Sequence, residues 1–407
     1  MEVLYPKCCG LDVHKKTVTA CMRSGRQSEV RTFRTVTREL VALSDWLAQA
    51  GCTHVAMEST GVYWKPVFNL LEGRFAVMLV NPKHIKQVPG RKTDVRDCEW
   101  IAQLLQHGLL SPSFVPGQDL RELRDLTRHR TKLTQQRASV SNRIQKVLED
   151  ANIKLASVAS DILGVSGRRM LQALASGQTN AEALADLSVA GLRKKIPELQ
   201  EALEGRVTGH HRFLLGELLA QLEHLDAAIE RVSGRIEERM RPFSAELERL
   251  DTIPGIALPL AQAILAEIGP DMAQFPSATH LTSWAAVCPG NNESAGKHKS
   301  GKTRKGNRWL KAALAEGAWA VSHTHDSALA ALYHRLARRR GKKRAITAVS
   351  RAILTIAYHL LRDQTVYREL GYNYLDRHTV EQTQRYLVRR LQALGLAVTV
   401  EPLPQAA

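Results

Sequence analysis

Residues 8–24 read "CCGLDVHKKTVTACMRS", a β-rich run that continues beyond Gly25-Arg26-Gln27 into a second one, "SEVRTFRTV" at 28–36. Valine and threonine recur in both runs, and the glycine between them is typical of a turn. The chain therefore opens with two or three strands, and Asp12 lies within the first of them.

The pattern after these strands alternates between helix and strand up to about residue 116. The runs that show it are "TRELVALSDWLAQAG" (37–51, helix), "THVAMES" (53–59, buried strand), "YWKPVFNLLEG" (63–73, helix), "FAVMLVN" (75–81, buried strand) and "TDVRDCEWIAQLLQHG" (93–108, helix). Alternation of this kind predicts an α/β domain, and strands that come first favour a sheet of ribonuclease H type over residues 1–116.

Long helices follow in residues 117–248. Apolar residues recur every seven positions at Leu126, Leu133, Val140 and Val147, and a second run extends from Leu218 to Ile236. The spacing predicts an antiparallel helical hairpin, either a coiled coil that pairs subunits or a bundle within one chain. Residues 156–208 interrupt the two helices as a small helical insert.

Residues 249–407 form a third, mainly helical region. It begins with "TIPGIALPLAQAILAEIG" (252–269), which is either a phosphate-binding helix-hairpin-helix element or an ordinary helical hairpin. A helix is expected from about Arg308 to Val321. Further on, "RLARRRGKKR" (335–344) is either a solvated basic face or an arm that contacts a nucleic-acid backbone.

The composition restricts the class of protein. The 407 residues carry a formal net charge of +17, which favours a polyanionic partner. The six cysteines form no C-x-x-C pair, so reduced core thiols are expected rather than a zinc site. No secretory signal or membrane-spanning run is recognisable, and a cytoplasmic protein without a membrane partner is predicted.

Four acidic residues stand out by their position in the first region. Asp12 and Glu58 lie in or at the end of strands, and Asp94 and Asp97 are one helical turn apart. Each alone could be a surface ion pair with a nearby lysine or arginine. Together they suit one or two Mg²⁺ ions, because carboxylate oxygen is the ligand that Mg²⁺ prefers and such ions can hold a phosphate.

A basic loop, "ESAGKHKSGKTRKGN" at 293–307, contains two serines, Ser294 and Ser300. A serine hydroxyl needs activation before it can react. The surrounding cations could bind a phosphate and stabilise negative charge: Lys297, Lys299, Lys302, Arg304, Lys305 and Arg308. Glu293 is the one acid in the loop, so carboxylates from the first region are the expected partners in activation.

The ordered set "GLDVHKKTV", "AMESTGVYW", "NPKHIKQVPGRKTDVRDCEWIAQLL" and "ESAGKHKSGKTRKGNRWLKAAL" resembles the IS110/IS1111 family of insertion-sequence transposases. The resemblance implies a RuvC-like domain with a D-E-D-D metal site at Asp12, Glu58, Asp94 and Asp97. It also implies a coiled coil and a C-terminal domain whose nucleophile is Ser294, with Ser300 as the competing candidate. Ala295 departs from the family, in which many members have glycine.

The same resemblance implies an activity and partners. A homodimer or homotetramer would bind donor and target DNA and a guide RNA encoded by the element. Ser294 would attack a DNA phosphodiester with Mg²⁺ assistance, and a hydroxyl of the partner DNA would then exchange the strands. Two other functions fit the residues: a two-metal RuvC-like nuclease that uses water, and a non-catalytic nucleic-acid-binding scaffold.

Overall fold

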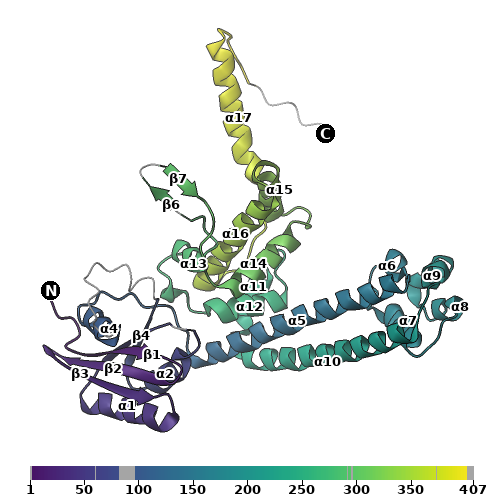
Figure 1. The fold of residues 1–407 in the computed structure, drawn as a ribbon. Helices are drawn as coiled ribbons and strands as arrows, with labels where there is room; N and C mark the ends of the chain where they lie inside the picture. The colour runs from purple at the N-terminus through teal and green to yellow at the C-terminus, as the bar shows by residue number, and fades with distance from the viewer. Residues whose placement is uncertain are drawn as a thin grey trace. The chain divides into compact units, whose positions relative to one another are not determined.

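A computed structural model describes residues 2–59, 61–81, 97–290, 292–294, 297–372 and 374–400, and in 292–294, 297–300, 375–383 and 386 only the backbone. The chain divides into two compact units, Met1–Gln118 and Asp119–Ala407 (Figure 1). No helix in the described part of the chain is long and apolar enough to cross a membrane.

A five-stranded mixed sheet forms the centre of the first unit, in the order β3-β2-β1-β4-β5. Strands β1 and β4 pair in parallel, as do β4 and β5, whereas β1, β2 and β3 form an antiparallel meander. Gly25, with φ +60°, lies at the first central position of the β2–β3 turn, where a type II′ turn requires glycine. The strands are β1 (Lys7–Val13), β2 (Thr17–Ser24), β3 (Gln27–Arg34), β4 (His54–Glu58) and β5 (Ala76–Val80).

Helices cover both faces of this sheet. Cys9, Leu11 and Met57 pack with residues of α1 (Thr37–Gln49) and α2 (Trp64–Leu71) on one face. On the other, Cys8 and Ala56 pack with Ile101 and Leu105 of α4 (Asp97–Gln106). Successive side chains of a strand point to opposite faces, so this alternation assigns each residue of β1 and β4 to one face.

Five of the six cysteines, those at positions 8, 9, 21, 52 and 98, are buried in this unit, and Cys288 is half-buried. Burial raises the pKa of the Cys8, Cys21 and Cys98 thiols to about 11 and that of Cys52 to about 12. At pH 8 these four thiols are therefore almost entirely protonated, whereas the thiolate is the reactive form.

We therefore expect one fast-reacting thiol per folded chain, Cys288, in a titration with Ellman's reagent at pH 8. The other five should react only after guanidinium unfolds the protein. Cys288→Ser should abolish the fast phase. A fast phase of two or more thiols in the folded wild type would contradict the burial of this group.

Two long helices dominate the second unit, α5 (Gln118–Asp150) and α10 (Gly209–Met240). They share one core within a single chain, built from residues such as Val140 and Ile144 of α5 and Leu218 and Leu222 of α10. A second heptad seam of α5 contains Leu123 and Ile144. Arg137 takes the place of an apolar residue in this seam and pairs with Asp226 of α10. The insert consists of α6 (Leu155–Val158), α7 (Val165–Ala175), α8 (Ala181–Ala185) and α9 (Ile196–Leu203).

The rest of the second unit is a helical bundle with one β-hairpin. Its central helix is α16 (Lys342–Asp363), which buries Val349, Ile353 and Leu354. The predicted helix at Arg308–Val321 is confirmed as α14. The remaining elements are α11 (Ser244–Asp251), α12 (Leu258–Ile268), α13 (Ala278–Trp284), β6 (Asn292–Ser294), β7 (Lys297–Ser300), α15 (Ala328–Arg340) and α17 (Tyr374–Ala393).

The turn between α11 and α12 is packed against α14. A Cβ atom at Gly255 would lie 2.7 Å from the Gly317 carbonyl oxygen of α14, and Ile256 is buried. This packing favours the ordinary helical hairpin over a phosphate-binding turn. The expectation of an α/β region followed by a mainly helical remainder is confirmed, while the narrower ribonuclease H assignment stays a prediction.

Candidate active site

Two of the predicted carboxylates lie at the carboxyl ends of neighbouring parallel strands. Leu11 of β1 pairs with Met57 of β4, so Asp12 and Glu58 are the next residues along the two strands. By alternation from Cys8 and Ala56, both belong to the face that α4 covers. The side chain of Asp12 is 28% exposed and accepts a hydrogen bond from His14 Nε2 at 3.1 Å.

Helix α4 brings a third carboxylate to the same end of the sheet. The carbonyl oxygen of Gln106, its last residue, accepts hydrogen bonds from the Leu4 and Tyr5 amides just before β1. Helix α4 therefore runs antiparallel to β1, and its first residue, Asp97, lies at the end of the sheet that carries Asp12 and Glu58.

Gly10 allows this close packing. A Cβ atom there would lie 2.3 Å from the Cys98 carbonyl oxygen and 2.4 Å from the Ala102 amide nitrogen. Both are backbone atoms, which cannot move aside as the end of a flexible side chain can. A glycine in β1 thus decides how closely the helix that carries Asp97 approaches the strand that carries Asp12.

We expect Gly10→Ala to destabilise the protein by about 1–3 kcal/mol, because α4 must move away from β1. The same shift should displace Asp97 and slow any reaction that needs it. Urea unfolding followed by circular dichroism measures the first effect. Gly73→Ala is the matched control, since a Cβ atom at Gly73 meets nothing within 4 Å. Equal unfolding midpoints for the two variants would contradict the tight packing.

The carboxylates suit a divalent cation by their chemistry. Asp12, Glu58 and Asp97 offer hard oxygen donors, which fit Mg²⁺ better than a zinc ion. Asp94, the fourth predicted ligand, lies outside the described residues. Over the ranges that the structure covers, no three His, Cys, Asp or Glu side chains come close enough to hold a metal ion together.

The predicted nucleophile, Ser294, is the last residue of strand β6. Its partner in the β6–β7 hairpin is Lys297, and Asn292 pairs with Ser300 at the other end. Ser294 thus lies toward the tip of the hairpin and Ser300 toward its base. The side chains of Ser294, Lys297, Lys299 and Ser300 lie outside the described part of the structure.

The base of the hairpin is held by close backbone contacts. A Cβ atom at Gly290 would lie 2.4 Å from the Lys302 carbonyl oxygen, and one at Gly306 would lie 2.9 Å from the Ala285 carbonyl oxygen. Arg304 also donates to Ser283 Oγ at 2.9 Å. The predicted phosphate-binding residues beyond β7 are exposed: Lys302, Arg304, Lys305 and Arg308.

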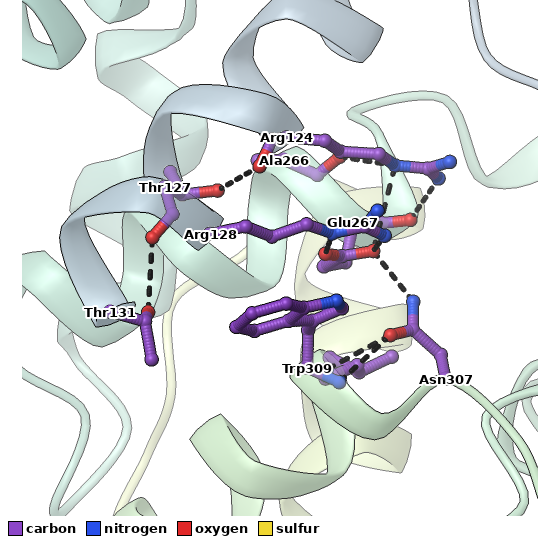
Figure 2. A network of polar contacts seen from close by, with 9 residues as sticks. Arg124, Thr127, Arg128, Thr131, Ala266, Glu267, Asn307 and Trp309 are labelled. Carbon is purple, nitrogen blue, oxygen red and sulfur yellow. Dashed lines mark hydrogen bonds and ion pairs between the residues drawn. The ribbon is translucent and has the colours of Figure 1, made fainter. Parts of the chain in front are cut away.

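Glu267 of α12, which the sequence pattern did not single out, lies in a buried network beside this loop (Figure 2). It is 2% exposed and accepts two hydrogen bonds from Arg128 of α5, at 2.6 and 2.8 Å. Asn307 Nδ2 donates to Glu267 Oε2 at 2.6 Å, and Arg124 Nε lies 3.6 Å from the same oxygen. Burial lowers the pKa of Arg124 to about 10, and Glu267 partly offsets this effect.

The network connects α5 to the end of the serine loop. Asn307 caps α14, because its Oδ1 accepts hydrogen bonds from the Trp309 and Leu310 amides. Figure 2 shows the side chains of Arg128 and Asn307 converging on Glu267 from α5 and from the start of α14. Glu267 therefore holds Asn307, the residue at which the serine loop ends and α14 begins. A glutamate inside the apolar run "LAQAILAEIG" was the available sequence signal.

We expect Glu267→Ala to destabilise the protein by about 3–5 kcal/mol, since it leaves two arginines without their buried partner. Glu267→Gln should cost less because it keeps one acceptor. Urea unfolding of the full chain measures both. Glu316→Ala, an exposed glutamate on α14, should change stability by less than about 0.5 kcal/mol. If Glu267→Ala were as stable as this control, the network would contribute nothing to the free energy of unfolding.

Comparison with known proteins relates both parts of this chain to transposases. Residues 9–153 match a family model for the DEDD transposase of IS110 type, and residues 247–334 match one described as the transposase IS116/IS110/IS902 family. These two segments contain Asp12, Glu58, Asp94, Asp97 and Ser294.

Three curated relatives are similar over parts of the chain. A 43.6 kDa protein of insertion element IS110 from Streptomyces coelicolor is 34% identical over 29% of this chain and 29% of its own length. The transposase candidate of the IS117 mini-circle from the same species is 30% identical over 41% of this chain and 39% of its own. A pilin gene-inverting protein of Moraxella bovis is 34% identical over 28% of this chain and 36% of its own length. The matches thus cover less than half of each relative.

Proposed function

Since this chain belongs to the IS110 family of transposases, we propose that it is a DNA recombinase that cleaves and exchanges DNA strands through Ser294. Asp12, Glu58, Asp94 and Asp97 assist the reaction. A structured RNA encoded by the element pairs with donor and target DNA and selects the sites, and the active form is a dimer or tetramer.

The observation that carries this proposal is the position of three carboxylates at one end of one sheet. Asp12 and Glu58 end neighbouring parallel strands, and Asp97 begins the helix that Gly10 allows onto β1. A protein that only binds nucleic acid has no need for three acids at the same end of one sheet. A net charge of +17 supports a polyanionic substrate.

The carboxylates would hold a divalent cation such as Mg²⁺, which supplies charge stabilisation at a phosphate when it is bound. The remaining chemistry belongs to side chains of this protein. Ser294 Oγ forms a bond to the DNA phosphorus and its proton passes to a base. The bond from phosphorus to the 3′ oxygen breaks, and that oxygen takes up a proton to become a free 3′ hydroxyl. The cations at 297–308 neutralise the phosphate as charge develops.

The second step reverses the first, with a hydroxyl of a different DNA strand as the attacking group. A hydroxyl of that strand attacks the phosphoserine, forms the new phosphodiester and releases the serine oxygen, which takes up a proton. One phosphate ester replaces another at each step. The reaction therefore needs no nucleoside triphosphate. Residues 296–303, "GKHKSGKT", have the spacing of a P-loop motif, but Lys297–Ser300 form strand β7 of a hairpin, whereas a P-loop connects a strand to a helix.

The test incubates the purified protein with the element-derived RNA, Mg²⁺ and end-labelled donor and target DNA. We expect an adduct that survives denaturation, and mass spectrometry of its peptides should place the DNA on Ser294. Cleaved DNA without an adduct would instead establish a hydrolytic nuclease. Binding without either product would establish a scaffold.

A further inference from the structure

A strongly cationic groove lies at the base of the serine hairpin, within the second unit. It has a volume of about 910 Å³ and is bordered by Gly301 and Lys302, which follow β7, and by the ends of α15 and α16. Its charged lining residues are all basic: Lys302, Arg340, Lys343, Arg344 and Arg351. Figure 1 shows the β6–β7 hairpin beside the helices that form this groove.

The basic side chains face the groove along one side of α16. Arg344, Thr347 and Arg351 lie three to four residues apart, which places them on one helix face. Arg340 ends α15 and adds charge from the other wall. Arg340, Arg344 and Arg351 are exposed, and no carboxylate among the described side chains pairs with them.

These charges are not placed to stabilise the helix that carries them. Lys342, Lys343 and Arg344 occupy the first turn of α16, which contains no acidic residue and no side-chain cap. The positive end of the helix dipole repels cations at this position. Three cations here therefore weaken the isolated helix, and an anionic partner would offset the repulsion.

A nucleic-acid backbone fits this groove better than a single small anion. Arg344 and Arg351 are seven residues apart, a rise of about 10 Å along the helix, and this length is about three nucleotides of a strand. The groove also leads to the hairpin. Ser294 lies about three residues, or about 10 Å, from the base of β7, where the groove begins.

We propose that this groove binds the sugar–phosphate backbone of the substrate DNA, a few nucleotides from the phosphodiester that Ser294 attacks. The backbone carries no sequence information, so the groove positions DNA of any sequence. The position relative to Ser294 rests on the proposed function. The binding of DNA in the groove does not.

The test measures fluorescence anisotropy of a labelled DNA duplex with the full-length protein at several salt concentrations, in EDTA to prevent cleavage. We expect Arg344→Ala/Arg351→Ala to raise Kd at least tenfold at 150 mM salt. Each lost phosphate contact lowers the slope of log K against log salt by about 0.9, so the slope should fall by about 2. Arg340→Ala should lower the slope of log K against log salt by about 1.

The matched control is Arg143→Ala/Lys146→Ala on the exposed surface of α5, which removes the same charge far along the chain. Its Kd should change less than threefold. Equal weakening by both pairs, unchanged DNA binding, or loss of binding to the element RNA alone would each overturn the proposal. The assay measures DNA binding without cleavage. A protein that never forms an adduct could therefore still show that the groove binds DNA. Failure of the proposed serine chemistry and failure of the groove proposal are thus distinguishable.

Discussion

Ser294→Ala is expected to abolish the covalent protein–DNA adduct and to lower strand exchange more than about a thousandfold. Removal of a nucleophile eliminates the covalent route, and the residual rate reflects binding alone. DNA binding should persist, because alanine removes one oxygen and leaves the loop cations in place. The adduct is measured by denaturing electrophoresis of labelled DNA, and exchange by amplification across the product junction.

Ser300→Ala is the matched control for this prediction. Ser300 lies in the same hairpin and pairs with Asn292, but at the base rather than near the tip. Its replacement should leave adduct formation within about threefold of the wild type. If the adduct persisted in Ser294→Ala and disappeared in Ser300→Ala, the assignment of the nucleophile would be wrong.

Asp12→Asn is the second replacement for which we expect a large loss of activity. Asparagine keeps the shape of the side chain and removes its charge, so DNA cleavage and adduct formation should fall at least about a hundredfold. Stability should change by less than about 1 kcal/mol, because Asp12 is partly exposed and its hydrogen-bond partner, His14, lies at the surface. Cleavage of labelled DNA and thermal unfolding measure the two effects separately.

The control for Asp12 is Asp45→Asn in the same unit. Asp45 lies on α1, which packs on the opposite face of the sheet, and pairs with Arg74 at 2.7 Å. This variant should cleave DNA at the wild-type rate. Wild-type cleavage by Asp12→Asn would remove the carboxylates from the mechanism and favour a binding scaffold.

The sequence alone determined the local structure and the candidate chemistry. The β-rich run at 8–24 predicted strands, and the pattern at 308–321 predicted a helix whose bounds the structure confirms. Asp12 and Glu58 were conspicuous because an acid beside buried strand residues is costly without a partner. Such signals are readable because hydrophobic periodicity reports the burial of each residue near its neighbours in the chain.

Only the tertiary structure decided which remote residues meet. The antiparallel path of α4 over β1 depends on Gly10 and Cys98, and the burial of Glu267 depends on arginines about 140 residues away. Arg137 broke a heptad in the sequence yet pairs with Asp226. The cationic groove likewise combines Lys302 with Arg344. Periodicity carries no record of such partners, because pairing between distant segments is set by the packing of the whole unit.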